Sequence, residues 1–395
     1  MLRNIKFYSE LQENLEILKK NDHYREFKTP DSIQKNTISF NGLELINLSS
    51  NDYLGISSDI DIQTKFLNYL IANPEYIQMG STSSRLLTGN SKIHDKLENK
   101  LAASFNRESA LIFNSGYHMN IGLIPSIMQK NDLILSDKLN HATIIDGILL
   151  SKSEFIRYPH NDLNALEELL KKNRHKYKNT IIITESIFSM DGDITDLEKL
   201  VEIASRYEAV TYLDEAHGFG VEGKTGLGLA EATGLIDRID IIGGTFGKSA
   251  ASSGAFIVCD KTVRDTAINK ARSVIFSTNI PPFQTAFNNF VIDIIKNKQN
   301  ERQHLANISK ILRKNIKNSG YKTKTASHII PVVTGSNRSA VDLYKYLHNN
   351  GFYCLPIRHP TVPMNTARIR ISLTALISEN DINRLSELIS NFQAS

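Results

Sequence analysis

Two segments of the chain place residue types that act on cofactors or nucleotides directly after short apolar runs. They are Asp214-Glu215-Ala216-His217 and residues 243–249, which end in Gly247-Lys248-Ser249. The runs before them are rich in β-branched residues, which is typical of strands buried on both faces of a parallel sheet. Ligands of such sheets bind beyond the carboxyl ends of the strands. Residues 114–116 and 185–193 also follow apolar runs, so we expect all four segments to line one crevice.

A nucleotide-driven motor is one interpretation of these segments. Asp214-Glu215-Ala216-His217 has the letters of a helicase-type Walker B box, and Gly247-Lys248-Ser249 resembles the end of a Walker A loop. A Walker A loop requires glycine at the position that Ile242 occupies. The order is also reversed, because Lys248 follows Asp214 in the chain. These departures disfavour a motor, and a merely structural ion pair between Asp214 and Lys248 is a further alternative.

Imine chemistry uses the same residues better. A lysine with the reference pKa of ~10.4 is almost fully protonated at neutral pH, so an imine-forming Lys248 needs surroundings that favour the free amine. Residues 243–247 form a small-residue turn that a cofactor can approach closely. Asp214 could keep a pyridine nitrogen protonated, as in pyridoxal phosphate enzymes. Residues 114–117 form a strand-to-helix turn whose backbone N–H groups suit a phosphate.

The elements that position these residues alternate between helix and strand from about Ser91 onward. Such alternation indicates an α/β fold with a mostly parallel central sheet flanked by helices. Helices are expected at residues 162–172 and 196–207. The predicted strands are residues 110–113, 133–135, 155–158, 180–184, 210–213, 239–242 and 255–258.

The two ends of the chain are organised differently. Residues 1–20 have the pattern of an amphipathic helix, and an Asn41-Gly42 turn predicts a hairpin. After Pro281-Pro282, charged helices lead into a smaller α+β domain that ends in a helix, with strands near residues 329–333, 352–355 and 368–373. We divide the chain into an N-terminal helix and hairpin segment (1–50), a large cofactor-binding domain (51–283) and a small C-terminal domain (284–395).

Composition limits the classes of protein. The chain has 395 residues, 41% of them hydrophobic and 22% charged, with a net charge of +4, which is typical of a soluble globular protein. Its basic residues form no stripe, and no apolar run could span a bilayer, so neither nucleic acid nor membrane is expected as a partner. Cys259 and Cys354 are too few for a zinc site and are expected to be buried thiols in a reducing compartment, the cytoplasm; no metal is expected.

Longer motifs give the chain a family resemblance. It resembles the α-oxoamine synthases, fold-type-I pyridoxal phosphate enzymes that condense an amino acid with an acyl thioester and release CO₂. The resemblance extends from about Tyr24 to Leu388. The motifs that carry it, in the family's order, are SSNDYLG at 49–55, TESIFSMDGD at 184–193, LDEAHG at 213–218 and GTFGK at 244–248.

The resemblance implies a role for each matching residue. Lys248 would form the imine with pyridoxal phosphate, Asp214 would bind the ring nitrogen, and His141 would stack on the ring. His217 would contact the ring hydroxyl and assist the acyl and decarboxylation steps. Residues 191–193 are interpreted as a turn without a ligand. The remaining cofactor-binding residues implied are Ser115, Gly116 and Tyr117 at the phosphate, and Ser189 and Thr245.

The C-terminal segment indicates the substrates. Residues 356–363 and 367–370 are most similar to the biotin-pathway members of the family, which implies L-alanine and a pimeloyl thioester, carried by coenzyme A or an acyl carrier protein. Arg358 and Asn51 would hold the α-carboxylate of the amino acid, and Arg25 would contact the acyl group. A sibling synthase that uses glycine, serine or another thioester stays open, as does a non-catalytic protein that binds the cofactor.

The resemblance also implies a homodimer with active sites between the subunits. Ser277 and Thr278 of one chain would approach the phosphate held by the other. Two departures from the family pattern concern neighbouring loops. His359 stands where the family commonly has a second proline, and residues 81–84 replace a more glycine-rich stretch.

Overall fold

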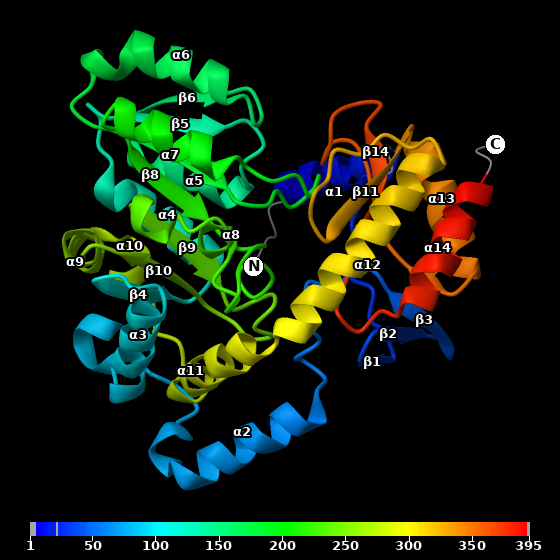
Figure 1. Ribbon diagram of the computed structural model, residues 1–395, viewed down its shortest axis with the longest axis horizontal. Coiled ribbons are helices and arrows are strands. Elements are labelled where there is room, and N and C mark those ends of the chain that lie inside the picture. Colours follow the sequence, from blue (N-terminus) through cyan, green and yellow to red (C-terminus); the bar gives the residue numbers. More distant parts are fainter. Residues whose placement is uncertain (1–4, 21–22, 393–395) are drawn as a thin grey trace.

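The chain folds into two lobes around sheets of different kinds (Figure 1). The computed structural model describes residues 5–20 and 23–392. The large lobe contains a seven-stranded sheet, and the small lobe contains a three-stranded sheet with α12 (Gln299–Asn318), α13 (Asn337–Asn349) and α14 (Glu379–Asn391) packed beside it. This architecture confirms the predicted α/β class with a smaller α+β unit.

The seven-stranded sheet positions the crevice. Six of its strands run in one direction, and β10 runs antiparallel to both of its neighbours. Nearly every side chain of the central strands is buried, which explains their continuous apolar runs. The spatial order is β4 (Ser109–Phe113), β10 (Ala255–Cys259), β9 (Ile241–Thr245), β8 (Val210–Asp214), β7 (Thr180–Glu185), β5 (Leu133–Asp137) and β6 (Glu154–Tyr158).

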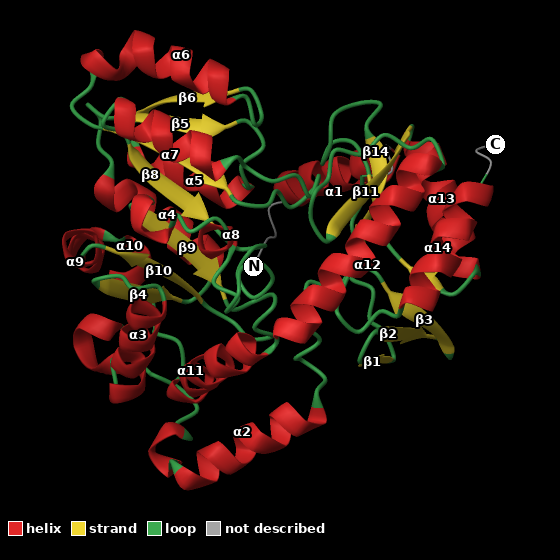
Figure 2. Cartoon of the chain, viewed as in Figure 1, coloured by secondary structure: helices red, strands yellow, loops and turns green. Residues whose placement is uncertain are grey.

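Helices cover both faces of this sheet (Figure 2). One face packs on α4 (Gly116–Ile127) and α5 (Ala142–Ser151), with α9 (Lys261–Lys270) and α10 (Arg272–Ile275) beside them. The other face packs on α3 (Lys92–Ser104), α6 (Leu163–Asn173), α7 (Leu197–Arg206) and α11 (Pro282–Asn297). The sheet is therefore enclosed, and only its strand ends are open to ligands.

One strand differs from its prediction by a shift along the chain. Residues 239–242 are predicted to form a strand, but β9 is Ile241–Thr245. The guanidinium of Arg107 donates hydrogen bonds to the carbonyl oxygens of Ile239 and, at 2.8 Å, of Asp240. These carbonyls are satisfied outside the sheet, so the strand begins after them.

The N-terminal hairpin is confirmed. Asn41 and Gly42 have positive φ angles of 51° and 77° between β2 (Thr37–Phe40) and β3 (Leu43–Asn47), as a tight hairpin turn requires. β1 (Ser32–Gln34) pairs with β2 on one side. Between residues 5 and 20 the predicted helix is also present as α1 (Ile5–Lys20), none of whose side chains is buried; residues 1–4 lie outside the described chain.

A strand is predicted at residues 352–355, and the structure has a shorter strand there, followed by a second one in another sheet. β12 (Phe352–Tyr353) pairs in parallel with β3, next to the N-terminal hairpin. β13 (Pro356–Ile357) instead joins β14 (Ala367–Ser372), which also pairs with β11 (Ile329–Gly335) in the small lobe. The predicted strand is present but ends early, because the chain changes sheets after Tyr353, which local propensity does not encode.

The two lobes have separate hydrophobic cores. α11 contributes Val291 to the core of the large lobe, while α12 contributes Leu305 to that of the small lobe (Figure 1). The domain limits at 50/51 and 283/284 remain predictions. Cys259 and Cys354 are buried free thiols, as predicted. Over the described ranges, none of the helices combines the length and apolarity needed to cross a membrane.

Candidate active site

The expected crevice lies at the carboxyl ends of the parallel strands. The Ser186 N–H donates to the Asp214 carbonyl (3.0 Å), and the Glu215 N–H donates to the Gly243 carbonyl (2.7 Å). The ends of β7, β8 and β9 are thereby joined. Ala255 of β10 pairs with both Thr245 and Phe113, so residues 114–116 follow β4 at the same edge of the sheet, and Asn120 of the next helix, α4, reaches Asp214. The predicted convergence of the four segments is confirmed.

Lys248 and His217 face each other in this crevice. The Lys248 Nζ lies 2.8 Å from His217 Nε2, and His217 Nδ1 lies 2.6 Å from the Tyr53 hydroxyl. Turns rather than a helix follow Lys248 through residue 254. A Walker A loop must lead into a helix, so the motor interpretation was wrong.

Burial lowers the pKa values of Lys248 and His217 and so favours their neutral forms. Desolvation lowers the pKa of Lys248 from the ordinary lysine value, although the Asp214 and Glu185 carboxylates oppose the shift. Burial, with Lys248 and Arg370 nearby, also holds the pKa of His217 well below the ordinary histidine value. The site therefore contains a readily deprotonated amine and a neutral imidazole, which is what imine chemistry requires.

The Asp214 carboxylate is held on both of its oxygens. Oδ1 accepts from the Ala216 N–H (2.9 Å), and Oδ2 accepts from the Asn120 side-chain amide (3.2 Å). The Tyr212 hydroxyl in turn donates to Asn120 Oδ1 (2.5 Å). Asp214 is 5% exposed, so this buried network fixes where its negative charge lies. No prediction from the sequence included Asn120 or Tyr212.

His141 caps the start of α5 and is oriented in a similar way. Its Nδ1 lies 3.0 Å from the Thr143 hydroxyl, and its backbone N–H donates to Glu185 Oε1 (2.6 Å). Burial lowers the pKa of the imidazole. Burial also raises the pKa of Glu185, and the neighbouring Asp214 adds to this shift. Glu185 is thus a buried group of the site that the sequence analysis did not assign.

The phosphate turn opens α4. Ser115 is the N-cap, and its hydroxyl accepts from the His118 N–H (3.2 Å). A Cβ built on Gly116 would meet nothing within 4 Å, so there is room in front of the first helical N–H groups. Tyr117 is half-exposed and its hydroxyl donates to Asp146 (3.0 Å). This end of α4 has the space and the polarity to bind an anion.

Ser277 and Thr278 lie beside the same turn. The Asn114 side-chain amide donates to the Thr278 carbonyl (2.7 Å), so this segment is tied to the phosphate turn of its own chain. Thr278 is exposed and Ser277 is partly exposed. Their assignment to the phosphate of a partner subunit stays a prediction.

Thr245 and Ser189 form part of the rim of the crevice. The Thr245 hydroxyl donates to the Gly254 carbonyl (3.0 Å) and accepts from the Gly247 N–H (3.1 Å), which shapes the turn that carries Lys248. The Ser189 carbonyl accepts from Arg370 Nε (2.6 Å). The contact of both residues with the cofactor stays a prediction.

Residues 191–193 form the predicted turn. The Phe188 and Gly192 N–H groups close it through bonds to the Asp193 (3.1 Å) and Phe188 (2.8 Å) carbonyls. Gly192 has φ +66°, and a Cβ there would meet the Ile329 carbonyl oxygen at 1.9 Å, so only glycine fits. The two aspartates have structural partners, Arg368 for Asp191 and His160 for Asp193.

Arg370, Tyr53 and His328 also act on the site, and no prediction assigned them a role. Arg370 lies close enough to Lys248 and His217 to lower the pKa of each. The sequence could have identified two of them. Tyr53 lies inside the SSNDYLG motif, and Arg370 lies two positions after Arg368 on the same face of β14. His328 left no signal in the sequence, because it precedes an ordinary apolar strand.

The substrate candidates lie in a second place. Arg25 and Arg358 line one cavity of about 980 Å³ between the N-terminal segment and β13. Arg25 Nη2 donates to the Thr361 hydroxyl (3.4 Å), while Asn51 accepts from the Tyr53 hydroxyl (3.1 Å) in the crevice. His359 lies in the same cavity, with its ring 5.9 Å from that of His23. Asn51 therefore belongs to the crevice and the two arginines to its surroundings.

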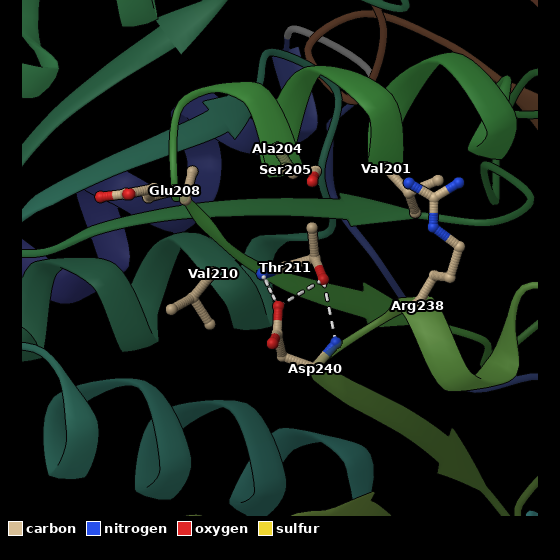
Figure 3. Close-up of a pocket in the computed structure, with 9 residues that line it drawn as sticks. Val201, Ala204, Ser205, Glu208, Val210, Thr211, Arg238 and Asp240 are labelled. Carbon is tan, nitrogen blue, oxygen red and sulfur yellow. Dashed lines mark hydrogen bonds between the residues drawn. The ribbon is translucent and has the colours of Figure 1, made fainter.

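Another hollow, of about 350 Å³, lies at the opposite ends of the strands (Figure 3). Its most prominent carboxylate is that of Asp240, which accepts from the Thr211 N–H (2.7 Å) and the Thr211 hydroxyl (2.8 Å). Asp240 and Thr211 are already paired with each other, and ligands of open α/β sheets bind at the carboxyl ends. This hollow is not the active site.

The donor set of the crevice fits pyridoxal phosphate. Lys248 offers the amine, Asp214 a buried carboxylate for a protonated ring nitrogen, and His141 an imidazole for the ring face. The start of α4, with open space over Gly116, offers N–H groups for the phosphate.

Known proteins agree with this assignment. Residues 44–389 match the family model described as aminotransferase class I and II. The chain is 47% identical to 8-amino-7-oxononanoate synthase of Haemophilus ducreyi, over 87% of this chain and 90% of that one. The serine palmitoyltransferase of Sphingomonas wittichii superimposes with a TM-score of 0.88 at 28% identity, covering 99% of this chain and 98% of that one. The 8-amino-7-oxononanoate synthase of Francisella tularensis gives a TM-score of 0.75 at 26% identity, covering 88% and 97%. The chain therefore belongs to the aminotransferase class I and II family and is a pyridoxal phosphate-dependent enzyme most like the α-oxoamine synthases.

Proposed function

We propose that this enzyme condenses L-alanine with a pimeloyl thioester, giving 8-amino-7-oxononanoate, CO₂ and the free thiol, as a cytoplasmic step of biotin biosynthesis. The observation that carries the proposal is the Lys248 amine 2.8 Å from a neutral imidazole, beside the buried carboxylate of Asp214. The name of the Haemophilus ducreyi relative, at 47% identity, supports the choice of substrates.

Each residue of the crevice has a task in this proposal. When bound, pyridoxal phosphate supplies a carbonyl carbon for amines and a ring that accepts electrons from carbon. Asp214 holds a proton at the ring nitrogen, and His141 orients the ring by stacking. The first turn of α4 binds the phosphate through its N–H groups. The network of Asn120 and Tyr212 keeps the Asp214 charge in place.

Lys248 and His217 move the protons. The burial that lowers the pKa of Lys248 makes its amine available to take the Cα proton of alanine. His217, neutral and hydrogen-bonded to Lys248, assists at the acyl carbonyl and during the loss of CO₂. Because His217 is 4% exposed, bulk water does not compete for these protons.

The substrate carboxylate and acyl chain use the residues around the crevice. Asn51 and Arg358 hold the α-carboxylate, and Arg370, partly buried beside Lys248, strengthens the positive field there. Arg25 contacts the acyl group in the cavity of about 980 Å³ that it shares with Arg358. A flexible acyl thioester requires a space of that size.

We further propose that the enzyme is a homodimer. Leu86, Leu87 and Phe276 are 52%, 78% and 69% exposed. The Asn279 side chain joins their two segments by donating to the Gly89 carbonyl (2.9 Å). A large exposed apolar patch beside a site supports a subunit contact. Sedimentation of Leu87→Glu, with the assay run on each species, tests this: a fully active monomer would contradict it.

A competition assay tests the substrates. Purified enzyme with pyridoxal phosphate and pimeloyl-coenzyme A receives equal L-alanine, glycine and L-serine, and the products are identified by mass. We expect the alanine-derived aminoketone to dominate. If glycine or serine is consumed instead, or if thiol is released only with another acyl chain, the enzyme is a sibling synthase and the interpretation of residues 356–363 is wrong.

A further inference from the structure

Tyr53 forms part of the crevice, yet the proposed chemistry leaves it without a task. Its side chain is fully buried, and its hydroxyl lies 2.6 Å from His217 Nδ1 and 3.1 Å from Asn51 Oδ1. A continuous hydrogen-bonded chain therefore runs from Lys248 through His217 and Tyr53 to Asn51. This series of hydrogen bonds begins at the reacting amine of Lys248 and ends at Asn51, which is proposed to bind the substrate carboxylate.

The donors and acceptors of this chain are determined by chemistry. A lysine ammonium has only donors, so while Lys248 carries its proton, His217 Nε2 must accept. The single proton of the neutral imidazole is then on Nδ1, and it is donated to the Tyr53 oxygen. The Tyr53 hydroxyl donates onward to Asn51 Oδ1, whose lone pairs make it an acceptor.

A hydroxyl can either accept a hydrogen bond from His217 Nδ1 or donate one to it, so Tyr53 can pair with both tautomers of His217. If the partner at Nε2 becomes an acceptor, the imidazole proton must be on Nε2, and Nδ1 then needs a donor. The Tyr53 hydroxyl supplies it by turning from Asn51 to His217. Burial raises the pKa of Tyr53 to about 12, so the hydroxyl keeps its proton in either arrangement.

His328 holds the other side of Tyr53. It lies just before β11 in the small lobe, 2% exposed, with its ring centroid 4.1 Å from that of Tyr53 at an interplanar angle of 68°. Neither ring nitrogen has a hydrogen-bond partner among residues 5–20 and 23–392. Burial lowers the pKa of His328 to about 3, so the ring is uncharged and acts by packing.

We propose that Tyr53 is a positioning residue that pairs with His217 Nδ1 and so keeps His217 in the one tautomer that its partner at Nε2 requires, and that His328 holds Tyr53 in place by packing against its ring. The inference rests on the proposed function only in giving His217 a proton-transfer task. The titratable and charged groups that act on His217 are Lys248, Arg370, His328 and His141, and none of them contacts Nδ1.

The first test observes the tautomer directly. The full-length chain is labelled with ¹⁵N-histidine, and the ring nitrogens are recorded with and without pyridoxal phosphate; His217→Asn identifies the signals. We expect one tautomer of His217 in the unaltered enzyme and a mixture in Tyr53→Phe, which retains the ring but not the hydroxyl. Tyr69→Phe is the matched control, since that hydroxyl is buried and unbonded. Unchanged His217 signals in Tyr53→Phe would overturn the proposal, whichever amino acid the enzyme uses.

The second test separates positioning from structure. We expect Tyr53→Phe to lower kcat about tenfold and to broaden the pH profile, while KM for both substrates and the melting temperature change little. His328→Ala should act in the same direction, and His328→Phe, which keeps an aromatic ring against Tyr53, should restore most of the rate. If His328→Phe is as slow as His328→Ala, packing is not how His328 acts.

Discussion

The crevice around Lys248 and the cavity around Arg25 and Arg358 are built in opposite ways. In the crevice, Glu185, Asp214 and His217 are 3%, 5% and 4% exposed, and each is hydrogen-bonded to the protein. In the cavity, Arg25 is exposed and its one described bond, to the Thr361 hydroxyl, is 3.4 Å long. Charges are buried and held by hydrogen bonds in the first region and are more exposed in the second.

The difference follows from the tasks of the two regions. Proton transfer requires groups whose pKa values and positions are set before the substrate arrives, and burial with full hydrogen bonding achieves this. Substrate binding at the entrance requires charges that can adapt to a flexible acyl chain. The exposed Arg25 and the half-buried Arg358 do so at small cost, because each remains partly hydrated.

Replacing Lys248 should reduce turnover more than any other substitution in the crevice. We expect Lys248→Ala to lower turnover at least about 10³-fold, because the group that takes and returns the proton is lost. Thiol release from the acyl thioester measures the rate, and circular dichroism checks the fold. Because burial lowers the pKa of Lys248, its removal should leave the melting temperature at pH 7 equal or higher. Appreciable turnover by a folded Lys248→Ala would contradict the assignment.

Asp214→Asn tests the fixed charge without changing side-chain size. Turnover at saturating cofactor should fall about 10²-fold, since an amide cannot hold the ring nitrogen protonated. Asp240→Asn, at the opposite ends of the strands, is the control and should retain the rate. Near-normal turnover in Asp214→Asn would remove Asp214 from the mechanism.

The arginines of the cavity should affect KM more than kcat. We expect Arg358→Met to raise KM for L-alanine about tenfold, and Arg25→Met to raise KM for the thioester by less, because one charged contact is lost in each. Steady-state kinetics with each substrate varied in turn separates the two. A fall in kcat with unchanged KM would move these residues into the crevice chemistry.

Replacing His160 should have the smallest effect on turnover, but it tests how two ion pairs contribute to the free energy of unfolding. Burial alone would lower its pKa, but hydrogen bonds to Asp137 and Asp193 raise it to about 10. The folded pKa exceeds the ordinary 6.5, so this stabilisation is complete below pH 6.5 and is lost as pH rises through 10. We expect His160→Gln to lower the free energy of unfolding by about 2 kcal/mol at pH 6. The deficit, measured by urea titration, should shrink toward pH 10; a deficit independent of pH would refute the ion pairs.

Much of the fold could be predicted because local patterns were consistent. The apolar runs identified the strands of the large sheet, and Asn41-Gly42 identified the hairpin. What failed was pairing over long distances. Residues 352–357 serve two sheets, and Arg107 delays the start of β9 from 132 residues away, at Ile239. Neither event leaves a periodic signal.

The site shows the same division. Lys248, Asp214 and His217 follow apolar strands, at the positions where ligands of such sheets bind. Their places in the sequence were therefore enough to identify them as candidates. Asn120 and His328 are polar residues in ordinary helical or strand-like surroundings, and Glu185 was located only as part of a segment, without a role. Their importance comes only from what lies opposite them in space.

By itself the sequence determined the α/β class, the strand-end positions of the reactive residues and the family to which they belong. These depend on local periodicity and on residue type, which are properties of neighbouring positions in the chain. Only the tertiary structure decided the protonation of Lys248 and His217 and the partners of Asp214 and Tyr53. Those properties arise from burial and from contacts between distant segments, so they do not exist until the chain has folded.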